Sequence, residues 1–504
     1  MTHADHSSIE RALSRQTDPR TPTVDHPFAA ARFDFTAPVP DASGLGRVHF
    51  LAIGGAGMSG VARIMLARGV AVTGSDAKDV PVLRALQAEG AAVWVGFHEG
   101  HQDRADAVVM SSSIRDDNVE LVAARDRGVP VLHRAQGLAA LMGDRRPVAV
   151  AGANGKTTTT SLLTVALQGC GLDPSFAVGG ELAKHGTNAH DGRDDVFVVE
   201  ADESDGSFVV YHPEVAIVTN VQPDQLDFYL TFTVVEAAYD AFVATIRPGG
   251  LLVTCADDEG SARLAERAKE RGVRVVTYGF TPGSDVLLTE HRAEGLASSV
   301  SLIDAGRTRL MSLGVPGRHN ALNAAAAYAA AVHGLDQGPE CILAGLASFT
   351  GTRRRFEPKG QAAGVVLIDD YAHNAGKVTA VVETAKALVG DSGRLIVVFQ
   401  PHLYSRTRDF ATELGAGLAP ADEVVVMDVY AAREDPLPGV SGQLVADAVS
   451  RARPSAAVHY VPSWSDVAAT VSAIARPGDL VLTVGAGDVT MIGPEVLRLL
   501  RGEA

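Results

Sequence analysis

A glycine-rich segment in the middle of the chain has the composition of a phosphate-binding loop. It reads Gly152-Ala153-Asn154-Gly155-Lys156-Thr157-Thr158 and follows an apolar run at 147–151 that predicts a strand. The glycines let backbone N–H groups turn toward phosphate, Lys156 adds a positive charge, and the Thr157 hydroxyl suits Mg²⁺. A helix after the loop adds its positive end. Gly152 stands three positions before Gly155, and not the usual five. The alternative, a glycine turn before a structural helix, is disfavoured by the strand–loop–helix context.

Two polar segments follow later strands of the same region. Glu200-Ala201-Asp202-Glu203-Ser204-Asp205 ends one apolar run, and the segment 220–229 follows another. Carboxylates at the carboxyl edge of a parallel sheet lie where ligands bind, and one of them can hold Mg²⁺ beside nucleotide phosphates. A solvated acidic loop is the alternative for the first segment, and helix capping by Asp224 and Asp227 is an equal alternative for the second.

Two polar clusters near the C-terminus also follow apolar runs. They are Asp369-Asp370-Tyr371-Ala372-His373-Asn374 and the segment 400–408, which contains His402 and Arg406. Arginine there can bind an acceptor carboxylate through two hydrogen bonds, with histidine adding a third. An arginine cluster at 353–355 marks a boundary, where it either reaches the γ-phosphate as domains close or forms a solvated linker.

The N-terminal region carries a second glycine loop, Gly54 to Gly60, between a predicted strand at 48–53 and a helical pattern. By itself this loop indicates a dinucleotide or a nucleoside diphosphate. A nicotinamide-dependent dehydrogenase is therefore an alternative. Such an enzyme would not need the second phosphate loop with its Gly-Lys-Thr sequence.

Strands that alternate with helices position all of these segments. Apolar runs at 71–76, 91–95 and 107–111 continue the first unit, and similar runs recur in two later units. This alternation predicts an α/β protein with parallel, doubly wound sheets, and Ser299 to Ile303 predicts an antiparallel addition. We predict a flexible arm at 1–45 and domains at 46–145, 146–350 and 351–504.

Composition excludes several classes of protein. The formal net charge of −16 argues against nucleic acid and against an anionic membrane surface as partners. No apolar run approaches the ~18 residues of a membrane span, and the first 45 residues lack a signal core. The three cysteines, Cys170, Cys255 and Cys341, are far apart and lack zinc-site spacing, which favours free thiols in a reducing cytoplasm.

Taken together, these segments resemble the Mur ligase family over residues 46–500. Further segments that carry the resemblance are Gly74-Ser75-Asp76, Ser112-Ser113-Ile114, His133-Arg134, Pro316 to Asn323, Arg354-Arg355-Phe356 and Phe399 to Thr407. The resemblance implies an N-terminal Rossmann-like UDP-binding domain, a central P-loop ATPase-like domain and a C-terminal Rossmann-like acceptor domain. It also implies an ATP- and Mg²⁺-dependent ligase that joins L-alanine to UDP-N-acetylmuramate in peptidoglycan synthesis, as a monomer or homodimer.

The resemblance also implies roles for particular residues. Lys156, Glu200, His373 and Arg406 are expected in catalysis. Expected nucleotide contacts are Gly152, Ala153, Asn154, Gly155, Lys156, Thr157, Thr158, His319, Asn320, Asn323 and Arg355. Expected substrate contacts are Gly55, Gly57, Met58, Ser59, Ser75, Asp76, Ser112, Tyr371 and His402, and expected metal ligands are Thr157, Glu200 and Gln225.

Three positions depart from the family pattern, in which histidine is usual. Asn154, Gln225 and Asn374 stand there instead, and all three lie near the expected reaction centre. An amide oxygen of Gln225 is still a hard-ion ligand. The departures leave open a homologue with attenuated or lost catalysis, one that only binds its ligands, or one with another acceptor. Ser204 stands where a murein tripeptide ligase usually has tyrosine, which weighs against a peptide acceptor.

Overall fold

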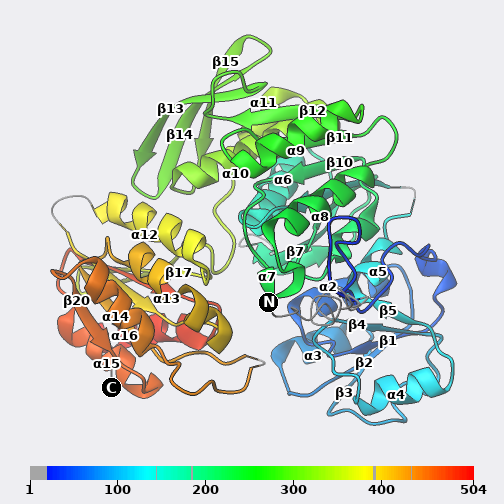
Figure 1. Ribbon diagram of the computed structural model, residues 1–504, viewed down its shortest axis with the longest axis horizontal. Helices are drawn as coiled ribbons and strands as arrows, with labels where there is room; N and C mark the ends of the chain where they lie inside the picture. Colours follow the sequence, from blue (N-terminus) through cyan, green and yellow to red (C-terminus); the bar gives the residue numbers. More distant parts are fainter. Residues whose placement is uncertain (1–19, 144, 183–185, 390–392, 433, 504) are drawn as a thin grey trace, which may run out of the picture. The chain divides into compact units, whose positions relative to one another are not determined.

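The computed structural model describes residues 20–143, 145–182, 186–389, 393–432 and 434–503 (Figure 1). The chain forms two compact units. Of the described residues, unit 1 contains those within 20–156, 173–177 and 189–278, and unit 2 contains those within 157–172, 178–188 and 279–503. Each unit is an α/β structure with a parallel sheet, which confirms the predicted fold class.

The N-terminal part of unit 1 is a five-stranded parallel sheet in the order β3-β2-β1-β4-β5. Its strands are β1 (Val48–Leu51), β2 (Val72–Asp76), β3 (Ala92–Val95), β4 (Ala107–Met110) and β5 (Val131–His133). Its helices are α2 (Ala56–Ala67), α3 (Pro81–Ala88), α4 (Val119–Asp126) and α5 (Arg134–Ala139). The order changes direction between β1 and β4, so the carboxyl edge beside β1 is the expected ligand crevice.

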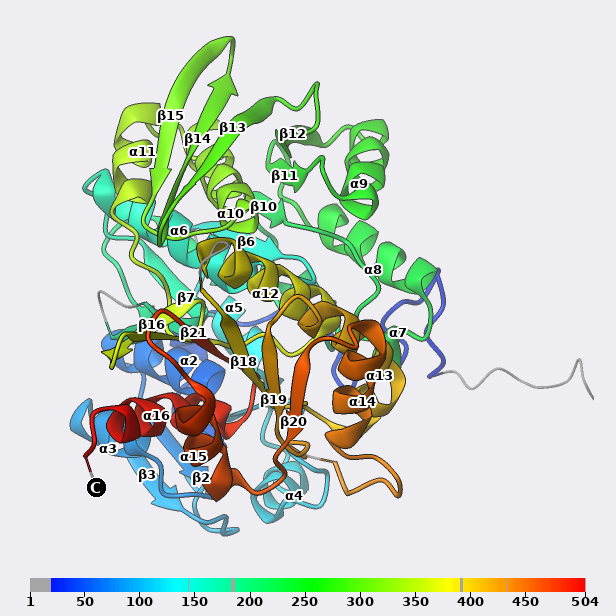
Figure 2. The same cartoon turned by 90° about the vertical axis from the view of Figure 1, so that its left-hand side faces the viewer.

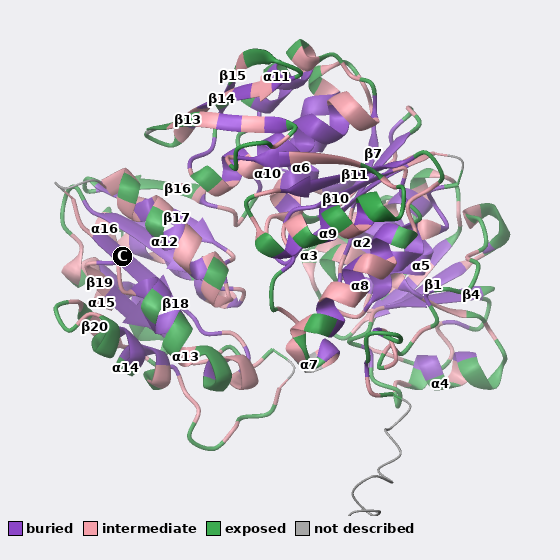
Figure 3. Cartoon of the chain, turned by 45° about the horizontal axis from the view of Figure 1, so that its top comes forward, coloured by how far each residue is buried: buried purple, intermediate pink, exposed green. Residues whose placement is uncertain are grey.

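The parallel strands of the second, ten-stranded sheet follow the order β12-β11-β10-β6-β9-β7, and β7 belongs to unit 1 as far as Ala177. Its strands are β6 (Arg146–Ala151), β7 (Ser175–Leu182), β9 (Val196–Glu200), β10 (Val215–Val218), β11 (Leu251–Cys255) and β12 (Arg274–Gly279). The helical elements are η2 (Ser207–Tyr211), α7 (Leu226–Tyr229), α8 (Phe232–Ala244) and α9 (Glu259–Glu270). The central strands are almost wholly buried, as expected for strands with helices on both faces (Figure 3).

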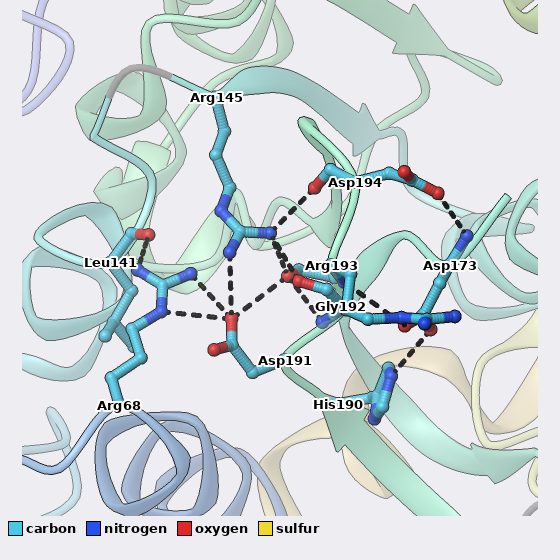
Figure 4. A network of polar contacts seen from close by, with 10 residues as sticks. Arg68, Leu141, Arg145, Asp173, His190, Asp191, Gly192, Arg193 and Asp194 are labelled. Atoms are coloured by element: carbon cyan, nitrogen blue, oxygen red, sulfur yellow. Dashed lines mark hydrogen bonds and ion pairs between the residues drawn. The ribbon is translucent and has the colours of Figure 1, made fainter.

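A network of arginines and aspartates connects the two sheets of unit 1 (Figure 4). Asp191 accepts hydrogen bonds from Arg68 at 2.7 Å and from Arg145 at 3.3 Å. Arg145 also donates to the backbone oxygens of Gly192 and Asp194 at 2.9 Å. Arg68 is the C-cap of α2, which packs on the N-terminal sheet, and Asp191 follows β8 (Thr187–His190). The ion pair between them therefore connects the N-terminal sheet to the second sheet.

Residues 20–45 are not the flexible arm that the sequence predicted. Phe35 is 5% exposed within the core, Phe33 packs beside it, and η1 (Ala42–Gly44) follows. The expectation failed because these aromatic residues have neither helical nor strand spacing, so no periodic signal marks them as core. The remainder of the predicted arm, residues 1–19, lies outside the described residues.

The first part of unit 2 combines an antiparallel meander with helices. The meander is β13 (Val286–Glu294), β14 (Ala297–Asp304) and β15 (Arg307–Leu313), which confirms the predicted antiparallel addition (Figure 2). The helices are α6 (Lys156–Gly169), α10 (Arg318–Ala329), the π-helix η3 (Ala330–Gly334) and α11 (Pro339–Ala347). A Cβ on Gly169 would lie 2.6 Å from the Gly345 Cα, so only glycine permits this approach of α11 to the end of α6.

A disulfide joins Cys170, just after α6, to Cys341 in the first turn of α11, with a Cα–Cα distance of 5.1 Å. This pairing corrects the prediction of three free thiols. Cys255 is the free cysteine, and it is buried. The sequence concealed the pair because its members are 171 residues apart and only the approach of α6 to α11 brings them together.

Removal of this disulfide is expected to destabilise the protein. A cross-link that closes so long a loop stabilises the folded state by up to about 5 kcal/mol in the chain-entropy model. Dithiothreitol should therefore lower the melting temperature, and Cys170→Ser should lower it equally without further sensitivity to dithiothreitol. Cys255→Ser is the matched control and should keep the sensitivity. A wild-type melting temperature that does not change when dithiothreitol is added would contradict the prediction.

The C-terminal part of unit 2 is a six-stranded sheet in the order β16-β17-β21-β18-β19-β20, parallel except for β16 (Figure 2). Its strands are β16 (Glu357–Ala362), β17 (Val365–Asp370), β18 (Leu395–Phe399), β19 (Glu423–Val426), β20 (Ala457–Tyr460) and β21 (Leu480–Val484). The helices are α12 (Ala375–Val389), α13 (Tyr404–Leu418), α14 (Gln443–Ala452), α15 (Trp464–Ile474), η4 (Asp488–Met491) and α16 (Ile492–Leu500). None of the helices in the described ranges is long and apolar enough to cross a membrane.

Candidate functional site

The central glycine loop has the backbone of a phosphate cradle. Gly152 and Gly155 have φ values of 133° and 86°, which disfavour any residue with a Cβ. A Cβ on Gly152 would also lie 2.0 Å from the Thr219 hydroxyl. The Asn154 N–H donates to the Asn220 side chain at 2.9 Å, and the Asn154 oxygen accepts from Thr219 at 2.5 Å. Residues after β10 therefore hold the loop open in a fixed shape.

Lys156 is turned back onto a carboxylate that the sequence did not single out. Its Nζ donates to Glu203 at 2.8 Å and to the Gly152 backbone oxygen at 2.7 Å. Burial alone would lower the pKa of Lys156, but Glu203, Asp202 and Glu200 raise it above its ordinary value. The lysine is thus a fixed cation, and a phosphate group competes with Glu203, which is only 3% exposed, for its charge.

The arginine cluster of unit 2 reaches the start of α6. Arg355 Nη2 donates to the Thr157 hydroxyl at 3.1 Å, and its guanidinium lies 5.2 Å from the Tyr371 ring centroid. Arg354 lies 4.7 Å from the same ring and donates to the backbone oxygens of Gly485 and Gly487. Arg355 therefore lies beside a predicted phosphate and metal residue, while Arg354 has a structural role.

The predicted magnesium ligands suit an ion that arrives with the nucleotide. Thr157, Glu200 and Gln225 each offer a side-chain oxygen atom, the ligand atom that Mg²⁺ prefers. Gln225 is the N-cap of α7 and has a φ of 53°. Among the residues described, no three histidine, cysteine or carboxylate side chains form a ready metal cage. Mg²⁺ usually relies on one or two carboxylates plus substrate phosphates, so these residues fit it.

The predicted adenine-side residues lie at the start of α10. Asn320 donates to the Pro316 oxygen at 2.7 Å, and Asn323 donates to Asn320 at 3.4 Å. Beside them the Arg318 guanidinium lies 3.5 Å from the Phe280 ring centroid, a cation–π contact that sequence reasoning missed. Burial, with His291 nearby, lowers the pKa of His319 to about 4.

This lowered pKa predicts a loss of stability in mild acid. Because folded His319 titrates near pH 4 and unfolded histidine near 6.5, the unfolded chain binds more protons between these values. The contribution of His319 to the free energy of unfolding is therefore present above about pH 6.5 and is lost as the pH falls. At pH 5.5 the loss is about 1 kcal/mol. The His319→Gln variant should lose less stability between pH 7.5 and 5.5 in urea titrations than the wild type. Equal losses in both proteins would contradict the assignment.

The N-terminal glycine loop ends at α2, whose N-cap is Gly55. Asp76 accepts a hydrogen bond from the Gly54 N–H at 2.9 Å, so the ends of β1 and β2 are tied together. Met58 and Ser59 are 3% and 2% exposed, so their side chains face the core. Their predicted contribution to substrate binding therefore depends on the backbone at the positive end of α2.

Two further side chains differ from the sequence-based picture of this crevice. The Ser75 hydroxyl is buried and donates to Glu120 at 2.5 Å, so it points away from the crevice. Arg134, noted in the sequence only as part of a family segment, lies over the start of α2, where a Cβ on Gly57 would lie 2.8 Å from its Nη1. The sequence signal for this position was a cation directly after another strand, β5, of the same parallel sheet. Arg134 is therefore added to the candidate substrate residues.

The C-terminal clusters meet at the carboxyl edge of their sheet. The rings of His373 and His402 are 5.6 Å apart, and the Tyr371 ring is 5.3 Å from His373. His373 Nδ1 lies 2.9 Å from the Tyr371 backbone oxygen, which can only accept, so Nδ1 carries the proton and Nε2 is a free base. Burial, with Lys377 and Arg406 nearby, holds the pKa of His373 well below its ordinary value.

Arg406 in α13 has the character of an unfilled anion site. Its Nη1 is buried and has no hydrogen-bond partner among the described residues. Buried donors are nearly always paired, so this one fits a ligand acceptor such as a carboxylate. Asp369 and Asp370, by contrast, are used internally: Asp369 accepts from Thr483 and Thr490, and Asp370 accepts from two backbone N–H groups.

Models of three protein domains match the chain. They are described as "Mur ligase family, catalytic domain" for residues 47–146, "Mur ligase middle domain" for 150–331 and "Mur ligase, glutamate ligase domain" for 354–487. The matches account for most of the chain and follow the order of the sheets. They leave the packed segment 20–45 outside.

Similar proteins include curated relatives named UDP-N-acetylmuramate–L-alanine ligase. The protein of Kineococcus radiotolerans is 55% identical over 471 residues, 92% of this chain and 98% of the relative. That of Saccharopolyspora erythraea is 53% identical over 91% of this chain and 94% of the relative.

Solved structures of Mur ligases are also similar to this chain. The UDP-N-acetylmuramate-alanine ligase of Thermotoga maritima matches with a TM-score of 0.77 and 27% identity, over 91% of this chain and 100% of that chain. A murein peptide ligase from Psychrobacter arcticus matches with a TM-score of 0.66 and 25% identity, over 90% and 99% of the two chains. With matching domain models over most of its length and relatives more than half identical, this chain belongs to the Mur ligase family.

Proposed function

We propose that this protein is an ATP-dependent ligase that joins L-alanine to UDP-N-acetylmuramate through an acyl phosphate in peptidoglycan synthesis. The observation that carries the proposal is the phosphate loop, in which Gly152 and Gly155 have positive φ values and Lys156 is held as a charged side chain. The names of relatives that are 49–55% identical support the substrates. They do not favour the alternative of a homologue without activity.

Phosphoryl transfer asks the protein mainly for position and charge. Lys156 stabilises the transferred phosphoryl group once it leaves Glu203, and Arg355 contributes a second cation beside Thr157. Thr157, Glu200 and Gln225 are the residues that would hold Mg²⁺, which would neutralise phosphate charge. Gly152 to Thr158, with His319, Asn320, Asn323 and Arg355, bind the nucleotide.

The UDP-sugar binds at the N-terminal sheet. Its diphosphate lies at the start of α2, where Gly55, Gly57 and Arg134 meet. Asp76 ends β2 and Ser112 follows β4, the two strands that flank β1. The positive end of a helix beside an arginine is suited to a diphosphate.

The amino acid binds at the C-terminal sheet edge. Arg406 takes its carboxylate, with Tyr371 and His402 beside it. His373 accepts a hydrogen bond at Nε2 from the amino group, because Nδ1 already carries the proton and the low pKa keeps the ring neutral. After the α-ammonium group loses a proton to solvent, the neutral amine attacks the acyl phosphate, which forms the amide and releases phosphate and a second proton.

The direct experiment measures phosphate release from purified protein with ATP, Mg²⁺, UDP-N-acetylmuramate and L-alanine. Release should require alanine and should be weaker with glycine or serine. Absence of alanine-dependent release at saturating substrate would overturn the proposal. Gln225→His should not raise turnover, because a glutamine oxygen is itself a suitable Mg²⁺ ligand. A large increase would instead mark the native residue as attenuating.

We place the enzyme in the cytoplasm, where ATP and UDP-sugars are available. The domain limits 46–145, 146–350 and 351–504 remain our proposal, as does the choice between monomer and homodimer.

A further inference from the structure

His133 forms a buried junction at the end of β5. It is 1% exposed, and it caps α5 because its Nδ1 accepts the Ala135 N–H at 3.2 Å. In the neutral ring, the proton therefore lies on Nε2. That nitrogen lies 3.2 Å from Asp205 Oδ2 and 3.2 Å from the Ser112 hydroxyl. His133 is thus a hydrogen-bond donor toward Asp205.

Asp205 connects two segments on which the proposed reaction depends. Its carboxylate accepts from Ser112 at 2.5 Å, in the loop after β4, and from the Ser207 N–H at 3.1 Å. It follows Glu200, the proposed metal ligand, by five residues. Although burial opposes it, the hydrogen bonds from His133, Ser112 and Ser207 hold the pKa of Asp205 well below its usual range. The carboxylate is therefore a permanent acceptor shared by the loops after β4 and β9.

These three residues are not the triad of a hydrolase. In such a triad the histidine accepts the serine proton and the carboxylate orients the histidine. Here the Ser112 hydroxyl donates directly to Asp205, and His133 Nε2 already carries a proton. The arrangement positions a loop and does not activate a nucleophile.

The packed N-terminal segment holds this junction from the other side. The rings of Phe33 and Phe35 each lie 5.2 Å from the His133 ring. Gln136 accepts the His133 N–H at 2.9 Å and donates to the Asp34 backbone oxygen at 3.1 Å. Arg32 donates to the Ile114 backbone oxygen, two residues beyond Ser112. Residues 32–35, which precede the first matched domain model at residue 47, therefore contact both His133 and the loop after β4.

We propose that His133 is a positioning residue for UDP-N-acetylmuramate, and that residues 32–35 are a strap that fixes it. The inference rests on the proposed function for the identity of the substrate. Through Asp205, His133 fixes Ser112 and the loop after β4 relative to the loop that follows β9. Small misplacement of a substrate-binding group is enough to cost one or two orders of magnitude in rate.

The test separates this junction from ordinary stabilisation. His133→Asn keeps a side-chain oxygen that caps α5 but is too short to reach Asp205. We expect the KM for UDP-N-acetylmuramate to rise about tenfold or more, while the KM for ATP changes less than twofold. His133→Gln, which places an amide donor near the original Nε2, should recover most of the loss. His459→Asn is the control, because it removes a histidine–carboxylate pair of 3.2 Å in the C-terminal sheet.

Hydrogen exchange in the substrate-free, full-length protein tests the junction independently of turnover. Amides of residues 111–116 should exchange faster in His133→Asn and Phe35→Leu than in the wild type or in His459→Asn. Unchanged exchange, or equal changes of both KM values in His133→Asn and His459→Asn, would overturn the positioning role. If exchange changes as expected but the wild type forms no product from alanine, the proposed function fails while the junction stands.

Discussion

Replacing Lys156 with methionine is expected to lower kcat/KM for ATP by about 10³-fold or more, because a preorganised charge at the transferred phosphoryl group is lost. Methionine keeps the length and apolar stem of the side chain. The native ammonium is held 2.7 Å from the Gly152 oxygen, so it occupies the concave side of the loop before the nucleotide arrives. Phosphate release under saturating L-alanine and UDP-N-acetylmuramate measures the effect.

The control for this variant is Lys269→Met in α9. That lysine is half-exposed and pairs with Glu266 at 2.9 Å, so its loss should leave the reaction unchanged. Exposed pairs contribute about 0–1 kcal/mol to stability. A Lys156→Met enzyme within tenfold of the wild type would remove the central loop from the reaction.

Glu203 gives the same experiment a second readout. In Lys156→Met, the buried Glu203 carboxylate loses the cation that lies 2.8 Å from it in the wild type, and it is expected to take up a proton. The double variant Lys156→Met/Glu203→Gln should then be more stable than Lys156→Met but equally inactive. If the double variant recovers stability but not activity, the role of Lys156 in catalysis is distinct from its role as the partner of the buried Glu203 carboxylate.

Strands and loop positions were predictable from the sequence because the sheets are parallel and buried. Leu395 to Phe399 is an uninterrupted apolar run, Val48 to Leu51 is apolar except for His49, and both are central strands. A parallel sheet brings the residues after each such run to one edge. For this reason His373 and His402, 29 residues apart, could be assigned to one cluster before their rings were seen 5.6 Å apart.

Side-chain direction and long-range pairing could not be read in the same way. Ser75 and Asp76 are neighbours in β2, so they point to opposite faces, and only the structure shows that Ser75 faces Glu120. Glu203 lay within a recognised acidic segment, but its pairing with Lys156 depends on how the loop after β9 turns. The disulfide partners are 171 residues apart, with residues 189–278 of unit 1 between them, and periodicity carries no information on so distant a contact.

Arg406→Lys is expected to raise the KM for L-alanine by about 10- to 100-fold while the KM for ATP stays within twofold, since a hydrogen bond to a charged group contributes about 1.5–3 kcal/mol. Lysine keeps the charge but not the planar fork that binds a carboxylate through two hydrogen bonds. Arg408→Lys is the matched control, since Arg408 is exposed and pairs with Asp409 at 2.7 Å. The two variants conserve charge equally, so a difference between them reports geometry at the buried Nη1 of Arg406. If Arg408→Lys raised the KM for alanine as much as Arg406→Lys, the carboxylate would have to bind elsewhere on the sheet edge, and His373 would lose its place beside the amino group.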